Sequence, residues 1–246
     1  MTEHQGTDMR RTGPIPWETR GSKWVACVDL LGFSRVVLGE QWDIIERVYE
    51  TAIQQLEEGP ASHSDVYHAW FSDTFLFYTQ DDSVPSFRSF ELRVRSFCET
   101  LITQDVPIRG AMSVGEFAAY PQKAIYVGQP LVDAYRQCED QNWIGFSVTP
   151  QAVDHLKEHG LRLEASGSYR YWDIPRNTGN SRGEGVLALI LGGVRRDLTK
   201  NSCYQALGRM ASEAPKDHVR TKYDHSLRFL EKFGVGEPMD LWAKNQ

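Results

Sequence analysis

Two aspartates stand where a metal site could form. Asp29 follows residues 24–28, an apolar run rich in β-formers that predicts a buried strand. Asp73 lies at the tip of residues 66–79, which we expect to fold back as two strands. Hard divalent cations prefer oxygen ligands from one or two carboxylates together with substrate phosphates. If these strands are neighbours in one sheet, both aspartates would serve one pair of metal ions.

The turn after Asp29 could bind an anion. Gly32, Phe33 and Ser34 lead into an expected helix, whose first backbone N–H groups suit a polyphosphate. With 27 Lys+Arg against 33 Asp+Glu, the net charge of −6 excludes a protein that coats nucleic acid by charge alone. A lone aspartate at a strand end is most often a turn or capping residue. The pair at this spacing favours metal binding, which would let an acidic chain hold an anion.

Hydrophobic periodicity and turn residues predict the elements that position these groups. Strands and helices alternate, but hairpins also occur, which indicates an α+β fold. We expect helices at 42–58, 86–104, from 127–130 to about 141, 151–159 and 199–234. We expect strands at 24–28, two within 66–79, and at 107–116, 146–148, 169–174 and 185–191.

Length and composition suggest one large domain with additions. Residues 1–22 are polar and predict a flexible arm, residues 23–194 a catalytic domain, and residues 195–246 a helical C-terminal extension. The N-terminal segment has no apolar core typical of a secretory signal, and no apolar run is long enough to span a bilayer. The four cysteines show no CxxC pairing, so we expect a reduced, cytoplasmic protein.

Four segments in order resemble the class III nucleotide cyclases. The run 27–34, CVDLLGFS, is similar to the motif in which Asp precedes Gly-Phe-Ser/Thr by two residues, and 71–76 resembles the second metal-aspartate hairpin. Residues 109–115 look like the strand before the dimer arm. Arg136 follows Gly128 by eight residues, the spacing of the family's glycine and transition-state arginine. Each motif is weak alone, and four in the correct order over about 24–190 are much stronger.

The resemblance implies a fold and a mechanism. The fold would be a ferredoxin-like core with an antiparallel-containing sheet and helices on one side, plus C-terminal helices. Asp29, the Leu30 carbonyl and Asp73 would hold two Mg²⁺ or Mn²⁺ ions, one lowering the pKa of the ribose 3′-hydroxyl and the other gripping the β- and γ-phosphates. Arg136, reaching over from the partner subunit of a homodimer, would stabilise the transferring phosphoryl group. Arg109 is a second candidate cation, although a strand arginine is more often solvated or structural.

Three departures from the family bear on the base. The lysine that reads a purine, six residues before the second metal aspartate, is Tyr67 here, and the aspartate three before the glycine is Ile125. The ribose-supporting asparagine is Val132, and whether the adjacent Asp133 replaces it stays open. The pattern most resembles the Pycsar pyrimidine cyclases of bacterial antiphage defence, in the strand 109–116 (RGAMSVGE), in lacking a membrane part and in a pocket tyrosine. Pyrimidines are smaller than purines, and a bulky Tyr67 would fill the space of a purine.

That resemblance implies cyclic UMP made from UTP, or cyclic CMP from CTP, as a second messenger read by a separate effector. Three rival functions stay open: a purine cyclase with a rewired pocket, a cyclase-like domain that only binds nucleotide or dimerises, and a palm-domain nucleotidyltransferase. The missing asparagine favours the second rival, whereas the two aspartates and the arginine oppose it. The acidic balance leaves little basic surface for a primer, and we expect no direct nucleic-acid or membrane partner.

Overall fold

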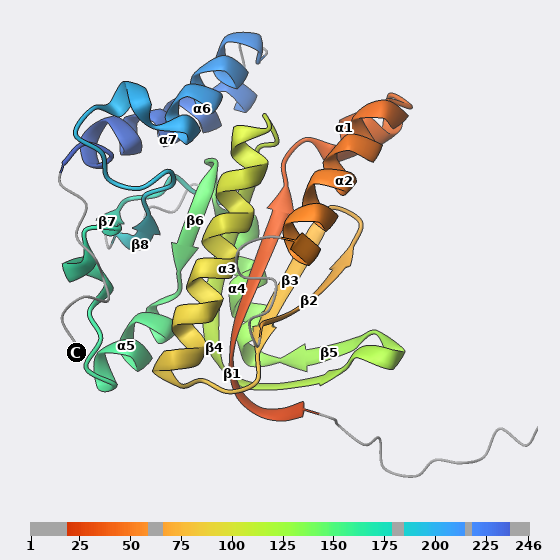
Figure 1. Ribbon diagram of the computed structural model, residues 1–246, viewed down its shortest axis with the longest axis vertical. Coiled ribbons are helices and arrows are strands. Elements are labelled where there is room, and N and C mark those ends of the chain that lie inside the picture. Colours follow the sequence, from red (N-terminus) through yellow and green to blue (C-terminus); the bar gives the residue numbers. More distant parts are fainter. Residues whose placement is uncertain (1–18, 59–65, 179–184, 215–217, 237–246) are drawn as a thin grey trace, which may run out of the picture.

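The structure is a computed structural model that describes residues 19–58, 66–178, 185–214 and 218–236. Its centre is one eight-stranded sheet of order β2-β3-β1-β4-β6-β8-β7, with β5 paired to β4 (Figure 1). Only the β4–β6 pair is parallel within the described sheet. The strands are β1 Thr19–Leu30, β2 Val66–Phe71, β3 Thr74–Thr79, β4 Ile108–Tyr120, β5 Ile125–Gly128, β6 Gly145–Val148, β7 Tyr169–Trp172 and β8 Val186–Leu189.

The main core lies between one face of the sheet and the long helices. Alternate residues of β1 and β3 face this side, and Trp24 meets Phe87 with ring centroids 4.7 Å apart. The C-terminal helices join the same core, since the ring centroids of Trp143 and of Phe229 in the last helix are 5.3 Å apart. The helices are α1 Phe33–Leu38, α2 Trp42–Glu58, α3 Val84–Thr103, α4 Gln129–Asp140, α5 Pro150–Glu158, α6 Ser202–Glu213 and α7 His218–Phe233.

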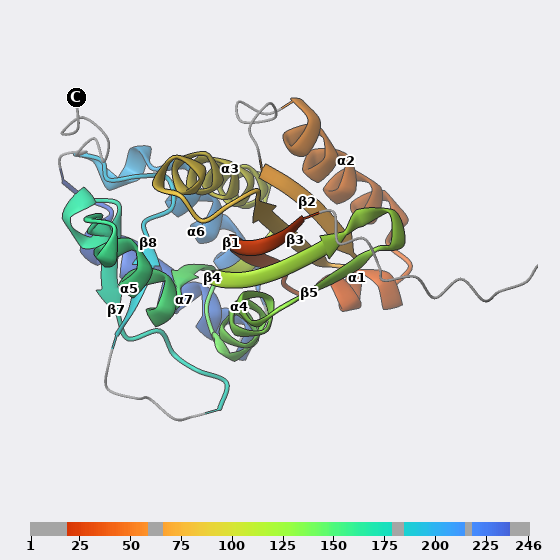
Figure 2. The same cartoon turned by 90° about the horizontal axis from the view of Figure 1, so that it is seen from below.

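The resemblance led us to expect helices on one side of the sheet, but helices pack on both faces. Helix α4 packs on the face opposite α3 (Figure 2). Its Ala134 joins a second, smaller cluster with Val25 and Cys27, which point away from the main core because successive strand residues alternate. The part of this face formed by β2 and β3 extends beyond α4, and there Phe71 is 86% exposed.

The α+β class is confirmed, and so are most of the expected elements. Helix α2 and the hairpin of β2 and β3 have the expected positions. Residues 19–22 of the expected arm belong to β1 instead, and residues 1–18 lie outside the described part. The expected helix 199–234 is divided after Ala214, whose extended backbone (ψ 143°) suits the residue before a proline. Within the described ranges, each helix is too short or too polar to cross a bilayer.

Candidate active site

Asp29 and Asp73 lie side by side at the ends of adjacent antiparallel strands. The Leu30 N–H donates to the Asp73 carbonyl oxygen at 2.9 Å, and Asp29 stands opposite Thr74 across the β1–β3 ladder. The Thr74 hydroxyl approaches an Asp29 carboxylate oxygen at 3.5 Å. The expectation that the two strands are neighbours is therefore confirmed, and their side chains belong to one end of the sheet.

A tyrosine supports the turn that carries Asp73. Tyr49 of α2 donates its hydroxyl hydrogen to the Ser72 carbonyl oxygen at 2.6 Å. Ser72 has φ of 52°, a left-handed backbone that a non-glycine residue keeps only where its surroundings hold it. The Phe33 ring meets Tyr49 edge-on at 5.7 Å. Tyr49 was missed by the sequence analysis, because helical spacing marks it only as a residue on an amphipathic face.

The turn at 32–34 opens a short helix, as expected. Gly32 precedes α1 with φ of 77°, a conformation that glycine adopts without the strain of a Cβ. Gly32 and Ser34 are exposed, whereas Phe33 is buried and anchors the turn. The helix has six residues, and the Arg35 N–H in its first turn donates to the Gly32 carbonyl oxygen at 3.0 Å.

Arg109 is the direct cationic partner of Asp29. It stands opposite Asp29 across the β1–β4 ladder, and its Nε and Nη2 atoms lie 3.1 and 3.0 Å from Asp29 Oδ2. The same guanidinium donates to the carbonyl oxygen of Glu139 at 2.9 Å and to the Glu139 carboxylate. The sequence analysis named Arg109 as a candidate cation but missed Glu139, since nothing in the helix pattern of α4 singles it out.

Burial gives Asp29 an unusual acidity. The pKa of its carboxyl is raised from 3.8 to about 6, because desolvation outweighs the lowering by Arg109 and the nearby charges of Asp73 and Glu139 add to the rise. The interaction with Arg109 does not fully offset the cost of burying the charged Asp29 carboxylate, so binding of a cation beside Asp29 would be favourable. Two carboxylates and a polyphosphate form the hard oxygen donor set that Mg²⁺ and Mn²⁺ accept. The residues present thus fit a divalent metal.

This acidity gives a stability prediction for the metal-free protein. The folded-state pKa of Asp29, about 6, lies above its ordinary value of 3.8, so the wild type loses stability as pH rises through that interval. Asp29→Asn removes the buried charge and should therefore be more stable than the wild type. At 1.36 kcal/mol per pKa unit, its free energy of unfolding should be higher by up to about 3 kcal/mol at pH 7. Urea unfolding at pH 4 and pH 7 in chelator measures the gain. A difference that does not grow with pH would contradict the raised pKa.

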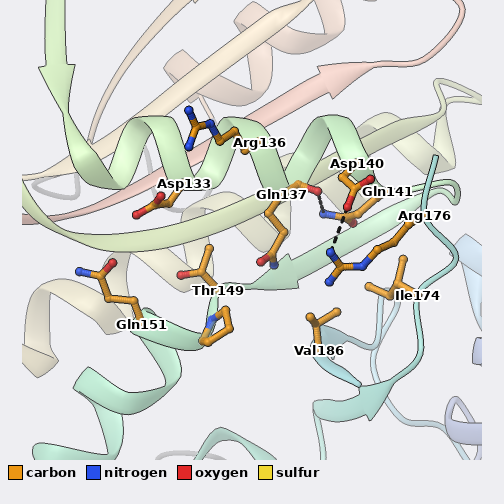
Figure 3. A pocket seen from close by; sticks show the side chains of 11 residues that line it. Asp133, Arg136, Gln137, Asp140, Gln141, Thr149, Gln151, Ile174, Arg176 and Val186 are labelled. Atoms are coloured by element: carbon orange, nitrogen blue, oxygen red, sulfur yellow. Dashed lines mark hydrogen bonds and ion pairs between the residues drawn. The ribbon is translucent and has the colours of Figure 1, made fainter. Parts of the chain in front are cut away.

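Arg136 lies one turn before Glu139 on the exposed side of α4. Its side chain is exposed, and no residue in the described ranges forms a hydrogen bond or ion pair with it. Figure 3 shows its guanidinium directed away from Thr149 and Gln151, which form the opposite wall of a cavity of about 550 Å³. The cavity is lined by Asp133, Arg136, Gln137, Asp140, Gln141, Thr149, Pro150, Gln151, Ile174, Arg176 and Val186.

Of the two residues at the family's base-reading positions, Tyr67 lies on the face of the sheet that α4 partly covers, whereas Ile125 points to the other face, because its neighbour Tyr126 packs on the cluster with Val25 and Cys27. Tyr67 of β2 is 43% exposed and stacks on Tyr78 at 5.3 Å with an interplanar angle of 20°. Tyr78 in turn contacts Tyr126, the neighbour of Ile125 in β5. Strand β5 itself was missed, because its four residues follow a turn and carry no clear alternation.

A single chain therefore brings together only part of the expected site. Asp29, Asp73 and Arg109 meet at one end of the sheet, and the turn at 32–34 follows directly. The charges that act on Asp29 come from Arg109, Asp73 and Glu139. Arg136 is not among these charges.

Comparison with known proteins identifies the fold. No protein-family model matches the sequence, and neither does any curated protein. Among solved structures, the guanylyl cyclase domain of the RhoGC fusion protein from the aquatic fungus Blastocladiella emersonii, as a monomeric double mutant, has 13% identity and a TM-score of 0.50. The match covers 69% of this chain and 94% of that one. The chain thus has the fold of class III cyclase domains.

Two further solved structures are also similar to the chain. The adenylyl cyclase CyaB from P. aeruginosa has 11% identity and a TM-score of 0.49, over 73% of this chain and 97% of that one. The guanylate cyclase domain of RhGC from Catenaria anguillulae, in complex with GTP, has 11% identity and a TM-score of 0.45. That match covers 68% of this chain and 93% of the other.

Proposed function

We propose that the chain is a nucleotide cyclase that converts UTP to 3′,5′-cyclic UMP and pyrophosphate as a homodimer. The observation that carries the proposal is the pair Asp29 and Asp73, joined by the Leu30 to Asp73 hydrogen bond at the strand ends of a cyclase fold. We assign the reaction to residues 23–194, with residues 195–246 as a helical extension.

The chemistry follows from what these residues can hold and move. Asp29, Asp73 and the Leu30 carbonyl would bind two Mg²⁺ or Mn²⁺ ions, which when bound lower the pKa of the ribose 3′-hydroxyl and neutralise phosphate charge. Gly32, Phe33 and Ser34 would direct backbone N–H groups at the polyphosphate. Arg136 would stabilise the charge that develops on the transferring phosphoryl group and on the leaving pyrophosphate.

Two features support a homodimer. Arg136 is exposed and is not among the charges that act on Asp29 in its own chain, which leaves it available to the site of a partner subunit. Large apolar side chains are also exposed around that helix and on the neighbouring strands, which is typical of an interaction surface. They are Phe71, Val127, Val132 and Tyr135.

The proposal of a pyrimidine substrate depends on the residues at the two base-reading positions. Tyr67 and Ile125 stand where purine cyclases carry a lysine and an aspartate, so the chain lacks both purine-reading groups there. A stacked tyrosine pair at Tyr67 and Tyr78 reduces the space for a base, which favours a pyrimidine. CTP is the alternative substrate, since neither Tyr67 nor Ile125 distinguishes the uracil O4 from the cytosine N4. The biological role we propose is second-messenger synthesis in the cytoplasm during antiphage defence.

Incubation with each of the four nucleoside triphosphates and Mn²⁺ tests the activity. We expect mass spectrometry to find cyclic UMP and pyrophosphate from UTP, with lower turnover of the others. Production of cyclic AMP or cyclic GMP as the main product would replace the pyrimidine proposal with a purine cyclase.

Replacing Tyr67 tests the basis of the base preference. Tyr67→Ala opens the space beside Tyr78, so we expect the use of GTP and ATP relative to UTP to rise by about tenfold, the scale of a reshaped apolar contact. Competition assays with mixed triphosphates measure the ratio. Tyr171→Ala, at an equally exposed strand tyrosine of β7, is the matched control and should leave the ratio unchanged. An unaltered base preference in Tyr67→Ala would contradict a role for Tyr67 in recognising the base.

A second candidate is a domain that binds nucleotide without turnover. The observation that favours it is the Arg109 guanidinium on Asp29 Oδ2, which competes with a metal for that oxygen. UTP binding by a folded dimer that leaves the nucleotide intact would decide for this candidate.

A further inference from the structure

Arg109 connects the strand end that carries Asp29 to helix α4. Its Nε and Nη2 both contact Asp29 Oδ2, at 3.1 and 3.0 Å, and its Nη1 donates to the Glu139 carbonyl oxygen at 2.9 Å. The Nη2 atom also donates to the Glu139 carboxylate, so two acids share one N–H-bearing nitrogen. The guanidinium is 11% exposed and Asp29 is 16% exposed, whereas the Glu139 side chain is 45% exposed.

This sharing makes the arginine exchangeable between two carboxylates. A guanidinium has five N–H donors in a fixed fork, so it can move its charge-assisted bonds from one acid to the other with a small displacement. The backbone of Glu139 has a second bond, because its carbonyl oxygen also accepts a hydrogen bond from Asn177 Nδ2 at 2.8 Å. The Glu139 carboxylate itself is bonded to Arg109 Nη2, so it is already in position to take more of the guanidinium's charge.

We propose that Glu139 is a positioning residue that draws Arg109 from Asp29 when a divalent cation binds there. The proposal rests on the proposed function only in taking Asp29 as a metal ligand. Without Glu139, the cation would have to compete with an arginine committed to Oδ2. With Glu139, the arginine keeps a charged partner both with and without the bound cation. Asp29 Oδ1 then keeps its contact with the Thr74 hydroxyl at 3.5 Å.

Replacing Glu139 should weaken metal binding through Arg109. Glu139→Gln leaves the carbonyl bond intact but removes the competing carboxylate, so Arg109 pairs more completely with Asp29. We expect the Mn²⁺ dissociation constant, measured without nucleotide from the EPR signal of free Mn²⁺, to rise about fivefold, near the lower end of effects seen for partners of metal ligands. Asp140→Asn is the matched control: it removes the same charge one residue further, where the acid pairs with Arg176 at 3.0 Å, and should leave the constant unchanged.

A double-mutant cycle separates this action from simple charge removal. In an Arg109→Gln background, Glu139→Gln should change the Mn²⁺ dissociation constant by less than about 1.5-fold, because its route to Asp29 is gone. Arg109→Lys serves as the background if Arg109→Gln does not fold, since a point charge cannot contact both acids as the fork does.

Equal effects in both backgrounds would show that Glu139 acts through space and overturn the proposal, as would a Glu139→Gln protein that binds Mn²⁺ as tightly as the wild type. Failure of the proposed function has a different signature. If Asp29→Asn binds Mn²⁺ as tightly as the wild type, Asp29 is not a metal ligand, whatever Glu139 does.

Discussion

Asp29→Asn and Asp73→Asn should each reduce cyclic nucleotide formation by at least about a thousandfold, the several kcal/mol of transition-state stabilisation that bound metals contribute. Asparagine keeps the shape of each side chain but supplies a neutral amide in place of the charged oxygens. With the two strand ends in contact, loss of either carboxylate would disturb the whole metal site. Initial rates with UTP and saturating Mn²⁺ measure the loss.

Stability measurements decide whether the loss of activity comes from lost chemistry or from unfolding. Asp29→Asn should be at least as stable as the wild type at pH 7, because the buried charge it removes is unfavourable there. Inactivity would then reflect lost chemistry rather than unfolding. Asp154→Asn, at a 71% exposed carboxylate of α5, is the matched control and should retain wild-type rates. A folded Asp29→Asn protein with more than a tenth of wild-type activity would contradict the metal role of Asp29.

Arg136→Ala should lower the rate by about 10²- to 10³-fold, the usual effect of removing one group that stabilises developing charge. Its position makes a stronger prediction. Arg136 is exposed and is not among the charges that act on Asp29 in its own chain, and in the proposed dimer each site would combine the Asp29 and Asp73 end of one subunit with α4 of the other. Two inactive variants, Arg136→Ala and Asp29→Asn, should then complement each other when mixed.

The expected recovery is quantitative. In a symmetric dimer, random exchange makes half of the molecules mixed, and each mixed dimer has one intact site of two, so the activity should reach about a quarter of the wild-type value. Refolding or co-expression of the two variants, followed by the same rate assay, measures it. The control is Asp29→Asn mixed with Asp73→Asn, which share the same half-site and should stay inactive. Recovery in the control but not in the test pair would rule out sites shared in this way.

Local features of the fold could be predicted because their signals lie in short segments. The turn at Ser72 and Asp73 between two β-rich runs predicted the hairpin, and the register then placed Asp73 beside Asp29. Thr149 and Pro150 predicted the start of α5, where the Thr149 side chain accepts a hydrogen bond from the Ala152 N–H. These residues fix backbone conformation by their own chemistry.

Features that depend on distant contacts could not be predicted. The face on which α4 packs is set by the alternation of β1 and by Ala134 against Cys27, a pairing that the helix pattern alone does not contain. The bridge from Asp29 through Arg109 to Glu139 joins residues 80 and 30 positions apart. The raised pKa of the Asp29 carboxyl follows from desolvation in the folded chain, against the lowering by Arg109, and has no signal in the sequence.

The most direct test of the central claim is the product stoichiometry of the wild-type protein with UTP and Mn²⁺. Mass spectrometry combined with a pyrophosphate assay should find cyclic UMP and pyrophosphate in equal amounts, and a chelator should abolish both if, as we propose, Asp29 and Asp73 hold the metals. If a folded dimer returns UTP unchanged, or yields linear UMP or an elongated primer, the chain is not a uridylate cyclase.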